Sequence, residues 1–228
     1  MSTSDISKAL AEHYAASFEA HGASPRGVDW GSNPQEHLLR LDRMLAVTQR
    51  GTPAGSSTSL LDVGCGFGSL LDRSLAIGLP LVYTGIDICE PMVEAARQRH
   101  PNARWMASDI LTAPTRDQHD YVVCNGILTQ KLGASIRDMD QFLKALVRQM
   151  FSLCKVGIAF NVMTSHVNFT APNLYYRNPA ELLAWCMSEI STKVILDHAY
   201  PLFEYTVYIY REDAPGMQYG LHHTGGAA

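Results

Sequence analysis

The chain has 228 residues, of which 46% are hydrophobic and 18% charged, a composition typical of a globular protein with a substantial core. Its formal net charge is −4 and it has no run of lysine or arginine, which argues against a nucleic-acid partner. No apolar run approaches the length of about 18 residues that a membrane span needs, and the N-terminus lacks the pattern of a signal peptide. We therefore expect a single cytoplasmic domain over residues 1–228, with neither a membrane nor nucleic acid as partner.

The cysteines and histidines indicate neither a metal site nor disulfides. The cysteines are scattered and odd in number, without a Cys-x-x-Cys pair, and the nine histidines lack the spacing of metal ligands. We expect Cys65, Cys89 and Cys124 to lie near the carboxyl ends of strands as small hydrophobic residues.

The first 55 residues are predicted to form a helical lid. Ser4 can cap a helix that runs to Glu19, with an apolar stripe at Leu10, Tyr14 and Phe18. A second helix is predicted to start at residues 33–34 (NP) and to turn Leu38, Leu41 and Leu45 inward. The glycine- and serine-rich residues 51–57 predict a flexible joint.

From residue 59 onward, apolar strand-like runs alternate with helical patterns, which predicts an α/β fold with a mostly parallel sheet flanked by helices. Strands are expected at residues 59–63, 81–86, 103–107, 120–125, 155–162, 193–199 and 204–211. Helices are expected at residues 69–77, 90–100, 137–153 and 179–190. Residues 163–178 show few signals of either kind and are predicted to be a second lid segment, and residues 214–228 a flexible tail.

The most informative segment is residues 60–68 (LLDVGCGFG), a buried strand that enters a glycine turn. Glycine lets the backbone bend sharply and approach a ligand without a Cβ in the way. Asp87 ends the next strand, 19 positions after Gly68, where a carboxylate can accept from both hydroxyls of an adenosine ribose. The spacing Gly-x-Gly-x-Gly and the carboxylate of Asp62 both differ from nicotinamide-binding sites, and they disfavour a dehydrogenase.

These motifs, together with residues 107–110 (ASDI) and 121–126 (YVVCNG), resemble the class I S-adenosylmethionine-dependent methyltransferases. The resemblance implies a Rossmann-like, seven-stranded sheet whose last strand is antiparallel. It also implies that Asp62 and the backbone of residues 64–68 hold the methionine moiety, that Asp87 binds the ribose, and that Asp109 with Ile110 binds the adenine. The cofactor-binding residues predicted from it are Trp30, Asp62, Gly64, Cys65, Gly66, Gly68, Asp87, Ile88, Met92, Asp109, Ile110, Asn125 and Gly126.

Methyl transfer by SN2 displacement needs a site that holds the sulfonium and aligns a nucleophile. Aromatic faces suit the cation, and the candidates are Tyr14, Trp30, Tyr175 and Tyr176. Packing of an aromatic lid is an equally good interpretation of the tyrosine pair, and Trp30 either covers the cofactor or anchors the N-terminal helices. The predicted catalytic residues are Tyr175, Tyr176, Asn125 and Asn161. His166 is a candidate general base, although an exposed or structural histidine is the more common case.

The leading hypothesis is methyl transfer to a small molecule. Residues 25–30, 125–132, 157–161 and 200–207 resemble a bacterial subgroup of small-molecule methyltransferase-like proteins. A second hypothesis comes from azetidine-2-carboxylate synthases of natural-product pathways, in which the α-amine of S-adenosylmethionine attacks its own Cγ and releases methylthioadenosine. A protein that binds the cofactor without catalysis is a third, disfavoured by the complete set of acidic residues.

Overall fold

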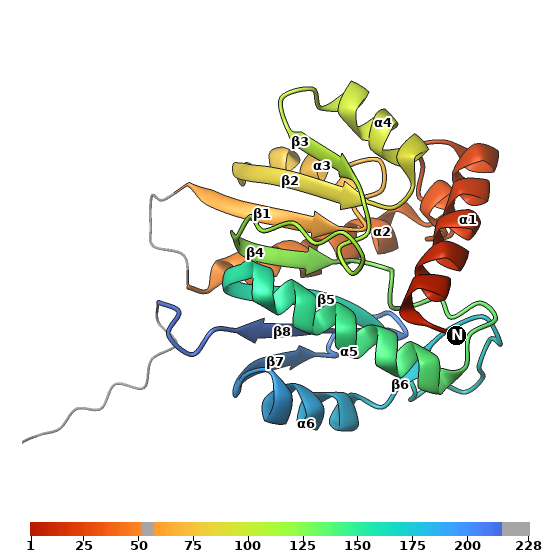
Figure 1. Cartoon of the computed structure of the whole chain (residues 1–228), viewed down its shortest axis with the longest axis vertical. Helices are drawn as coiled ribbons and strands as arrows, with labels where there is room; N and C mark the ends of the chain where they lie inside the picture. Colours follow the sequence, from red (N-terminus) through yellow and green to blue (C-terminus); the bar gives the residue numbers. More distant parts are fainter. Residues whose placement is uncertain (52–56, 216–228) are drawn as a thin grey trace, which may run out of the picture.

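The computed structural model describes residues 1–51 and 57–215. In this part of the chain, strands form one mixed sheet in the order β3-β2-β1-β4-β5-β8-β7, with β6 beside β5 (Figure 1). All pairings are parallel except those of β8, which runs antiparallel to both β5 and β7. The strands are β1 (Thr58–Val63), β2 (Leu81–Asp87), β3 (Arg104–Ala107), β4 (His119–Cys124), β5 (Cys154–Thr164), β6 (Tyr176–Arg177), β7 (Lys193–Asp197) and β8 (Glu204–Tyr210).

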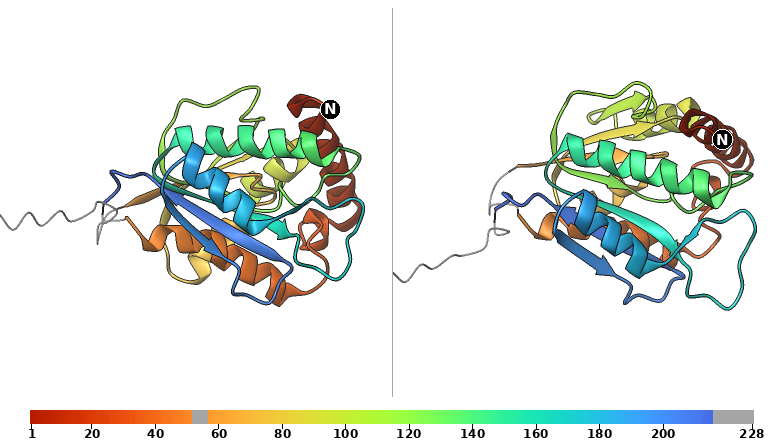
Figure 2. Two further views of the ribbon diagram at one scale, coloured as in Figure 1. Left: turned by 90° about the horizontal axis from the view of Figure 1, so that it is seen from below. Right: turned by 60° about the horizontal axis from the view of Figure 1, so that its bottom comes forward.

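Helices cover both faces of this sheet (Figures 1 and 2). The buried side chains of α5 and α6 pack on one face, and those of α2, α3 and α4 pack on the other. Helix α1 lies beyond the carboxyl ends of the strands, and its buried residues Ile6 and Leu10 join the core of the first face (Figure 1). Successive side chains of β1 point to opposite faces of the sheet, so that Leu61 and Val63 belong to the first core and Leu60 belongs to the second. The helices are α1 (Thr3–His21), α2 (Pro34–Leu45), α3 (Ser69–Ala76), α4 (Glu90–Arg99), α5 (Ile136–Leu153) and α6 (Pro179–Glu189), with the 3-10 turns η1 (Arg26–Val28) and η2 (Ala46–Gln49).

The predicted α/β class and the order of its elements are confirmed, and the predicted strand boundaries lie within two residues of the observed ones. The second helix starts where expected, since the side chain of Asn33 accepts from the backbone of Gln35 and Pro34 occupies the first turn. The first helix starts earlier than predicted. Ser2, not Ser4, is its cap, because the side chains of Ser2 and Asp5 each accept from the other's backbone in a capping box.

The segment 163–178 differs from the expectation of a loop without regular structure. Strand β5 continues to Thr164, and the two-residue strand β6 pairs with its end. A strand of two residues is too short to leave a periodic pattern, so the sequence gives no sign of it. Most of the predicted joint and of the predicted tail, residues 52–56 and 216–228, lies outside the described residues.

All five cysteines are buried free thiols. Burial raises the pKa of each thiol, to about 11 for Cys154 and to about 12 for Cys186. Over residues 1–51 and 57–215, we find no helix with the length and apolar character needed to cross a membrane.

Gly85 of β2 provides a test of the packing around it. A Cβ at Gly85 would lie 2.4 Å from Cζ3 of Trp105 and 2.8 Å from Sγ of Cys65. We therefore expect Gly85→Ala to lower the free energy of unfolding by about 1–3 kcal/mol, measured by chemical denaturation. Gly133 is the matched control, because a Cβ there meets no atom within 4 Å, and Gly133→Ala should leave stability nearly unchanged. Equal stability of the two variants would contradict the packing described around Trp105.

Candidate functional site

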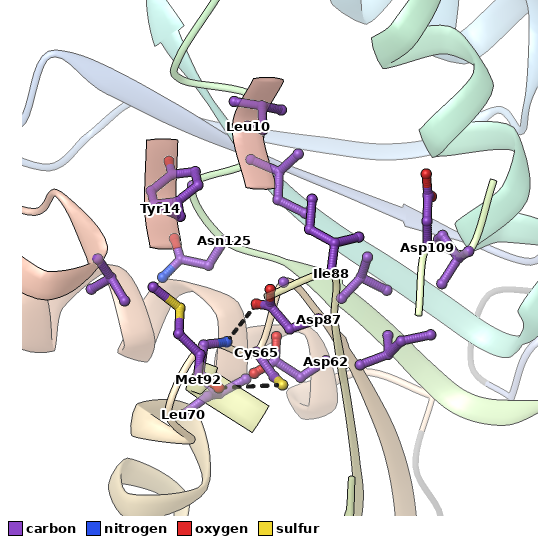
Figure 3. Close-up of a pocket in the computed structure, with 18 of the residues that line it drawn as sticks. Leu10, Tyr14, Asp62, Cys65, Leu70, Asp87, Ile88, Met92, Asp109 and Asn125 are labelled. Carbon is purple, nitrogen blue, oxygen red and sulfur yellow. Dashed lines mark hydrogen bonds between the residues drawn. The ribbon is translucent and has the colours of Figure 1, made fainter. Parts of the chain in front are cut away.

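A pocket lies at the edge of the sheet where β1, β2, β3 and β4 end (Figure 3). The space inside it is about 980 Å³ when it is counted out into the open mouth. Asn125 and Tyr14 lie at one end, Asp109 at the other, and Asp87 between them. This arrangement follows the strand order, since Asp109 follows β3, Asp87 ends β2, and Asn125 follows β4.

The turn between β1 and α3 forms the floor of the pocket. Gly64, Gly66 and Gly68 have φ values of +75°, +53° and +90°, which residues with a Cβ rarely adopt. The backbone N–H of Gly64 donates to the carbonyl of Ile86 at 2.8 Å, and that of Gly66 donates to Oδ2 of Asp87 at 2.8 Å. The glycine turn is therefore fastened to the end of β2.

Asp87 is a buried carboxylate with both oxygens engaged. Oδ2 accepts from Gly66 and Oδ1 accepts from the backbone N–H of Cys89, each at 2.8 Å. Burial raises the pKa of Asp87, and the backbone donors act against that shift. Because a carboxylate oxygen has two lone pairs, each oxygen can still accept from a ligand.

Asp62 lies at the end of β1 and lines the same pocket. Its Oδ2 accepts from the hydroxyl of Tyr83 at 2.6 Å. Burial raises the pKa of Asp62 to about 7, and the charge of Asp87 adds to this effect. Asp62 therefore takes up a proton at a higher pH than an exposed carboxylate does, and a cationic ligand would favour its charged form.

The Asp109 end of the pocket is mostly apolar. Oδ1 of Asp109 accepts from the backbone N–H of Leu111 at 2.8 Å. Ile110 and Leu111 follow Asp109 directly and line the pocket, and Ile110 is buried. This end suits a flat heterocycle with polar groups at its rim.

A closed set of contacts supports the turn after β4, and we call it the Gly126 ring: Gly126, Asn161, Glu204, Arg40 and Trp30. Oδ1 of Asn161 accepts from the N–H of Gly126 at 2.8 Å, and its Nδ2 donates to Glu204 at 2.6 Å. Nε of Arg40 donates to the other oxygen of Glu204 at 2.6 Å, and the guanidinium lies 4.2 Å from the centroid of Trp30. A Cβ at Gly126 would lie 2.6 Å from Cζ2 of Trp30, so the ring closes by contact.

The structure brings most of the predicted cofactor-binding residues together. The members that line the pocket are Trp30, Asp62, Gly64, Cys65, Gly66, Asp87, Ile88, Met92, Asp109, Ile110, Asn125 and Gly126. Gly68 does not line it, because its Cα faces Trp105, where a Cβ would lie 2.9 Å from Cη2.

Of the four predicted catalytic residues, one lines the pocket and three do not. Asn125 lines the pocket, and its Oδ1 is buried without a hydrogen-bond partner in the described structure. Asn161 lies behind the pocket, in the Gly126 ring. The placement of Tyr175 and Tyr176 around the ligand is wrong: Tyr175 is buried in the core and donates to Asp140, and the hydroxyl of Tyr176 accepts from Ala171 at 3.1 Å. The cause is β6, which pairs with β5 and holds this segment to the sheet.

The other candidates from the sequence are also divided. Tyr14 lines the pocket, and burial raises its pKa, with the charges of Asp29 and Asp87 adding to the shift. His166 does not line the pocket; its backbone donates to the hydroxyl of Thr164.

Sequence reasoning missed several residues of the pocket. His37 is one of the polar residues among them, and a signal existed, because it precedes the inward-facing Leu41 by one helical turn. Ser7 and Leu10 of α1 and Phe142 and Leu146 of α5 also line the pocket. Among the described residues, no group of three or more histidine, cysteine or acidic side chains could hold a metal ion.

A sheet of this order, with a glycine turn after β1 and an acidic residue at the end of β2, defines the Rossmann-like fold of class I methyltransferases. Residues 60–151 match the family model described as a methyltransferase domain. The chain is 33% identical over 158 residues to the Mycobacterium tuberculosis protein named "Putative methyltransferase Rv1506c", an alignment that covers 68% of this chain and 95% of that relative. The chain therefore belongs to the methyltransferase family.

More distant similarities agree on the fold. The ribosomal protein L11 methyltransferase of Vibrio vulnificus is 24% identical over 131 residues, which are 58% of this chain and 44% of that protein. The structure of magnesium protoporphyrin IX methyltransferase from Synechocystis, with bound S-adenosylmethionine, aligns with a TM-score of 0.60 at 17% identity, covering 89% of this chain and 97% of that one. The amino pentose methyltransferase CalS10 of Micromonospora echinaspora aligns with a TM-score of 0.54 at 17% identity, covering 79% and 92%.

The Gly126 ring predicts a large effect of removing Glu204. Glu204→Ala leaves the guanidinium of Arg40, 14% exposed, without its carboxylate. We expect the free energy of unfolding to fall by about 3–5 kcal/mol, measured by chemical denaturation. Glu189→Ala is the matched control, since Glu189 pairs with Arg148 on the surface and should contribute less than about 1 kcal/mol. Similar losses in both variants would show that the ring is no more important than a surface ion pair.

Proposed function

We propose that this protein transfers the methyl group of S-adenosylmethionine to a small molecule that binds in the same pocket. The observation that carries the proposal is the convergence of Asp62, Asp87, Asp109 and Asn125 from the ends of four adjacent strands. Residues of α1, η1 and α2 line the pocket as well, as a lid formed by residues 1–55 would. A pocket covered in this way favours a small acceptor over a macromolecule.

The strand order sets the direction in which the cofactor lies. Adjacent strands are about 4.8 Å apart, so the edge from β3 across β2 and β1 to β4 spans about 14 Å. The adenine belongs beside Asp109, in the apolar end with Ile110 and Leu111. The ribose hydroxyls belong at Asp87, and the methionine moiety lies over the glycine turn with its ammonium toward Asp62.

The reaction requires little proton chemistry from the protein at the sulfonium itself. The acceptor atom attacks the methyl carbon, the carbon–sulfur bond breaks, and its electron pair stays on sulfur as S-adenosylhomocysteine forms. Asn125, which lines the pocket beside Tyr14 after β4, is the residue to which we assign the orientation of the acceptor. Tyr14 supplies an aromatic ring for the sulfonium, whereas Trp30 already has the guanidinium of Arg40 over it.

The position of the two tyrosines favours methyl transfer over cyclisation of the cofactor. The cyclase hypothesis drew on Tyr175 and Tyr176 to hold the sulfonium, and both lie outside the pocket. The experiment that separates the two reactions is incubation of the protein with S-adenosylmethionine, alone and with a panel of small amines, alcohols and phenols, followed by mass spectrometry. We expect S-adenosylhomocysteine and a methylated acceptor. Enzyme-dependent methylthioadenosine with an azetidine amino acid, formed without any acceptor, would instead establish cyclisation.

Asp87 is predicted to be essential for affinity. Asp87→Ala removes charged hydrogen bonds to the ribose and frees the glycine turn at Gly66. We expect the dissociation constant of S-adenosylhomocysteine, measured by calorimetry, to rise by about tenfold or more. Asp117→Ala, at an exposed carboxylate paired with Arg104, is the control and should leave binding unchanged. Unaltered affinity in Asp87→Ala would remove this residue from the ribose site.

Asp62 predicts a pH dependence of binding. Because the pKa of Asp62 is about 7, the fraction of Asp62 that is protonated increases as the pH falls below neutral. Only the charged form attracts the ligand's ammonium, which keeps its own proton up to about pH 8. Affinity for S-adenosylhomocysteine should therefore rise between about pH 6 and pH 7.5, with proton release on binding detectable by calorimetry in two buffers. Asp62→Asn should bind more weakly at neutral pH and lose this dependence, and a dependence kept by the variant would exclude Asp62 as its origin.

A further inference from the structure

Strand β7 leaves one edge of the sheet open. It is the last strand in the sheet order, and within the described residues its neighbour in the sheet is β8 alone (Figure 1). All five of its residues, 193–197 (KVILD), are half-buried, whereas all seven of β8 are buried. An open edge presents backbone N–H and C=O groups with which a further strand can pair. The middle of β7, residues 194–196, carries neither a charge nor a proline, which are two of the usual protections of an edge.

Helix α6 adds apolar surface beside this edge. It packs on β7 and β8, next to α5, which packs on β4 and β5. The ring of Trp185 lies 5.5 Å from the guanidinium of Arg148 of α5, and Glu189 pairs with the same arginine, so this flank of α6 faces α5. Leu183 and Met187 each lie about half a helical turn from Trp185, on the flank that borders the open edge. Met187 is 47% exposed.

The charges of β7 make the strand complementary to itself. Lys193 and Asp197 carry opposite charges at its two ends, and Ile195 lies midway between them. If two copies of β7 pair antiparallel about Ile195, Lys193 of each copy lies opposite Asp197 of the other, on one face of the joined sheet. On the other face Val194 lies opposite Leu196, beside the apolar flanks of the two α6 helices.

We propose that two copies of this chain associate through the open edge of β7 and the adjoining flank of α6, as a two-fold symmetric dimer with one continuous sheet. A dimer of this kind needs a single patch that is complementary to itself, and a strand with opposite charges at equal distances from its middle meets this condition. Backbone hydrogen bonds give such an edge its affinity, and the charge pairs fix its register. The edge lies three strands beyond β4, so the inference is independent of the proposed function of the pocket.

The oligomeric state and one exposed side chain test the interface. Sedimentation equilibrium would measure association of the wild type, Met187→Glu and Leu75→Glu, with thermal melting to check that each variant folds. We expect a wild-type dimer, with twice the mass of the chain. Met187→Glu should raise the dissociation constant of the dimer by about tenfold or more, because it brings carboxylates into the joined apolar surface. Leu75→Glu is the matched control, since Leu75 is an apolar residue of α3 that is 57% exposed, and it should leave association unchanged.

Charge reversal tests the register of the paired strands. Lys193→Glu places a carboxylate opposite Asp197 at both ends of the pairing, and it should also weaken the dimer. The double variant Lys193→Glu, Asp197→Lys restores opposite charges across the interface. We expect it to associate more tightly than Lys193→Glu, even though it removes the hydrogen bond from Arg43 to Asp197 within each chain.

Three results would overturn the inference. The first is a wild type that stays monomeric at every concentration. The second is a dimer that Met187→Glu leaves intact or that Leu75→Glu weakens to the same degree, since the contact would then lie elsewhere on the surface. The third is a double variant that associates no more tightly than Lys193→Glu, which would refute the antiparallel pairing about Ile195.

Discussion

The constraint on which this site depends is the buried carboxylate of Asp87. Its two oxygens join the glycine turn after β1 to the backbone before α4, through the N–H groups of Gly66 and Cys89. A buried carboxylate without donors would be strongly unfavourable, and these charge-assisted hydrogen bonds offset that cost. The same group therefore shapes the floor of the pocket. In the proposed function its remaining lone pairs accept from the ribose, so the local fold and the binding of the cofactor would depend on one carboxylate.

The Gly126 ring supports another wall of the pocket in a similar way, through a buried carboxylate with hydrogen-bond donors on both oxygens. The turn after β4 depends on an amide from β5, a carboxylate from β8 and a guanidinium from α2. Trp30 then connects α2 back to Gly126 through the guanidinium of Arg40. Because Glu204 is almost completely buried, the ring is a desolvated network whose members support one another. The N-terminal segment and the carboxyl edge of the sheet are thereby held in one arrangement.

The sequence predicted the elements and most of the pocket because their signals are local. Apolar periodicity marks the strands, and the glycine turn with its two aspartates marks the edge where they meet. Tyr175 was misplaced because its position depends on Asp140 of α5 and on the pairing of β6, which are contacts distant in sequence. The same holds for Glu204, whose partners lie in α2 and β5. Among the pocket residues that sequence reasoning missed, His37 could have been found, because it lies one helical turn before Leu41 on the inner face of α2.

The buried thiols have a chemical consequence for a protein that binds an alkylating agent. Cys65 lies in the wall of the pocket, where a thiolate would compete with the acceptor for the methyl group. Burial raises the pKa of Cys65 well above its usual range, and the neighbouring carboxylates of Asp87 and Asp62 raise it further. Since the thiolate is the nucleophile, this residue stays in its inert form beside an electrophile. In the proposed function, the negative charge that would attract the sulfonium also disfavours the thiolate of Cys65.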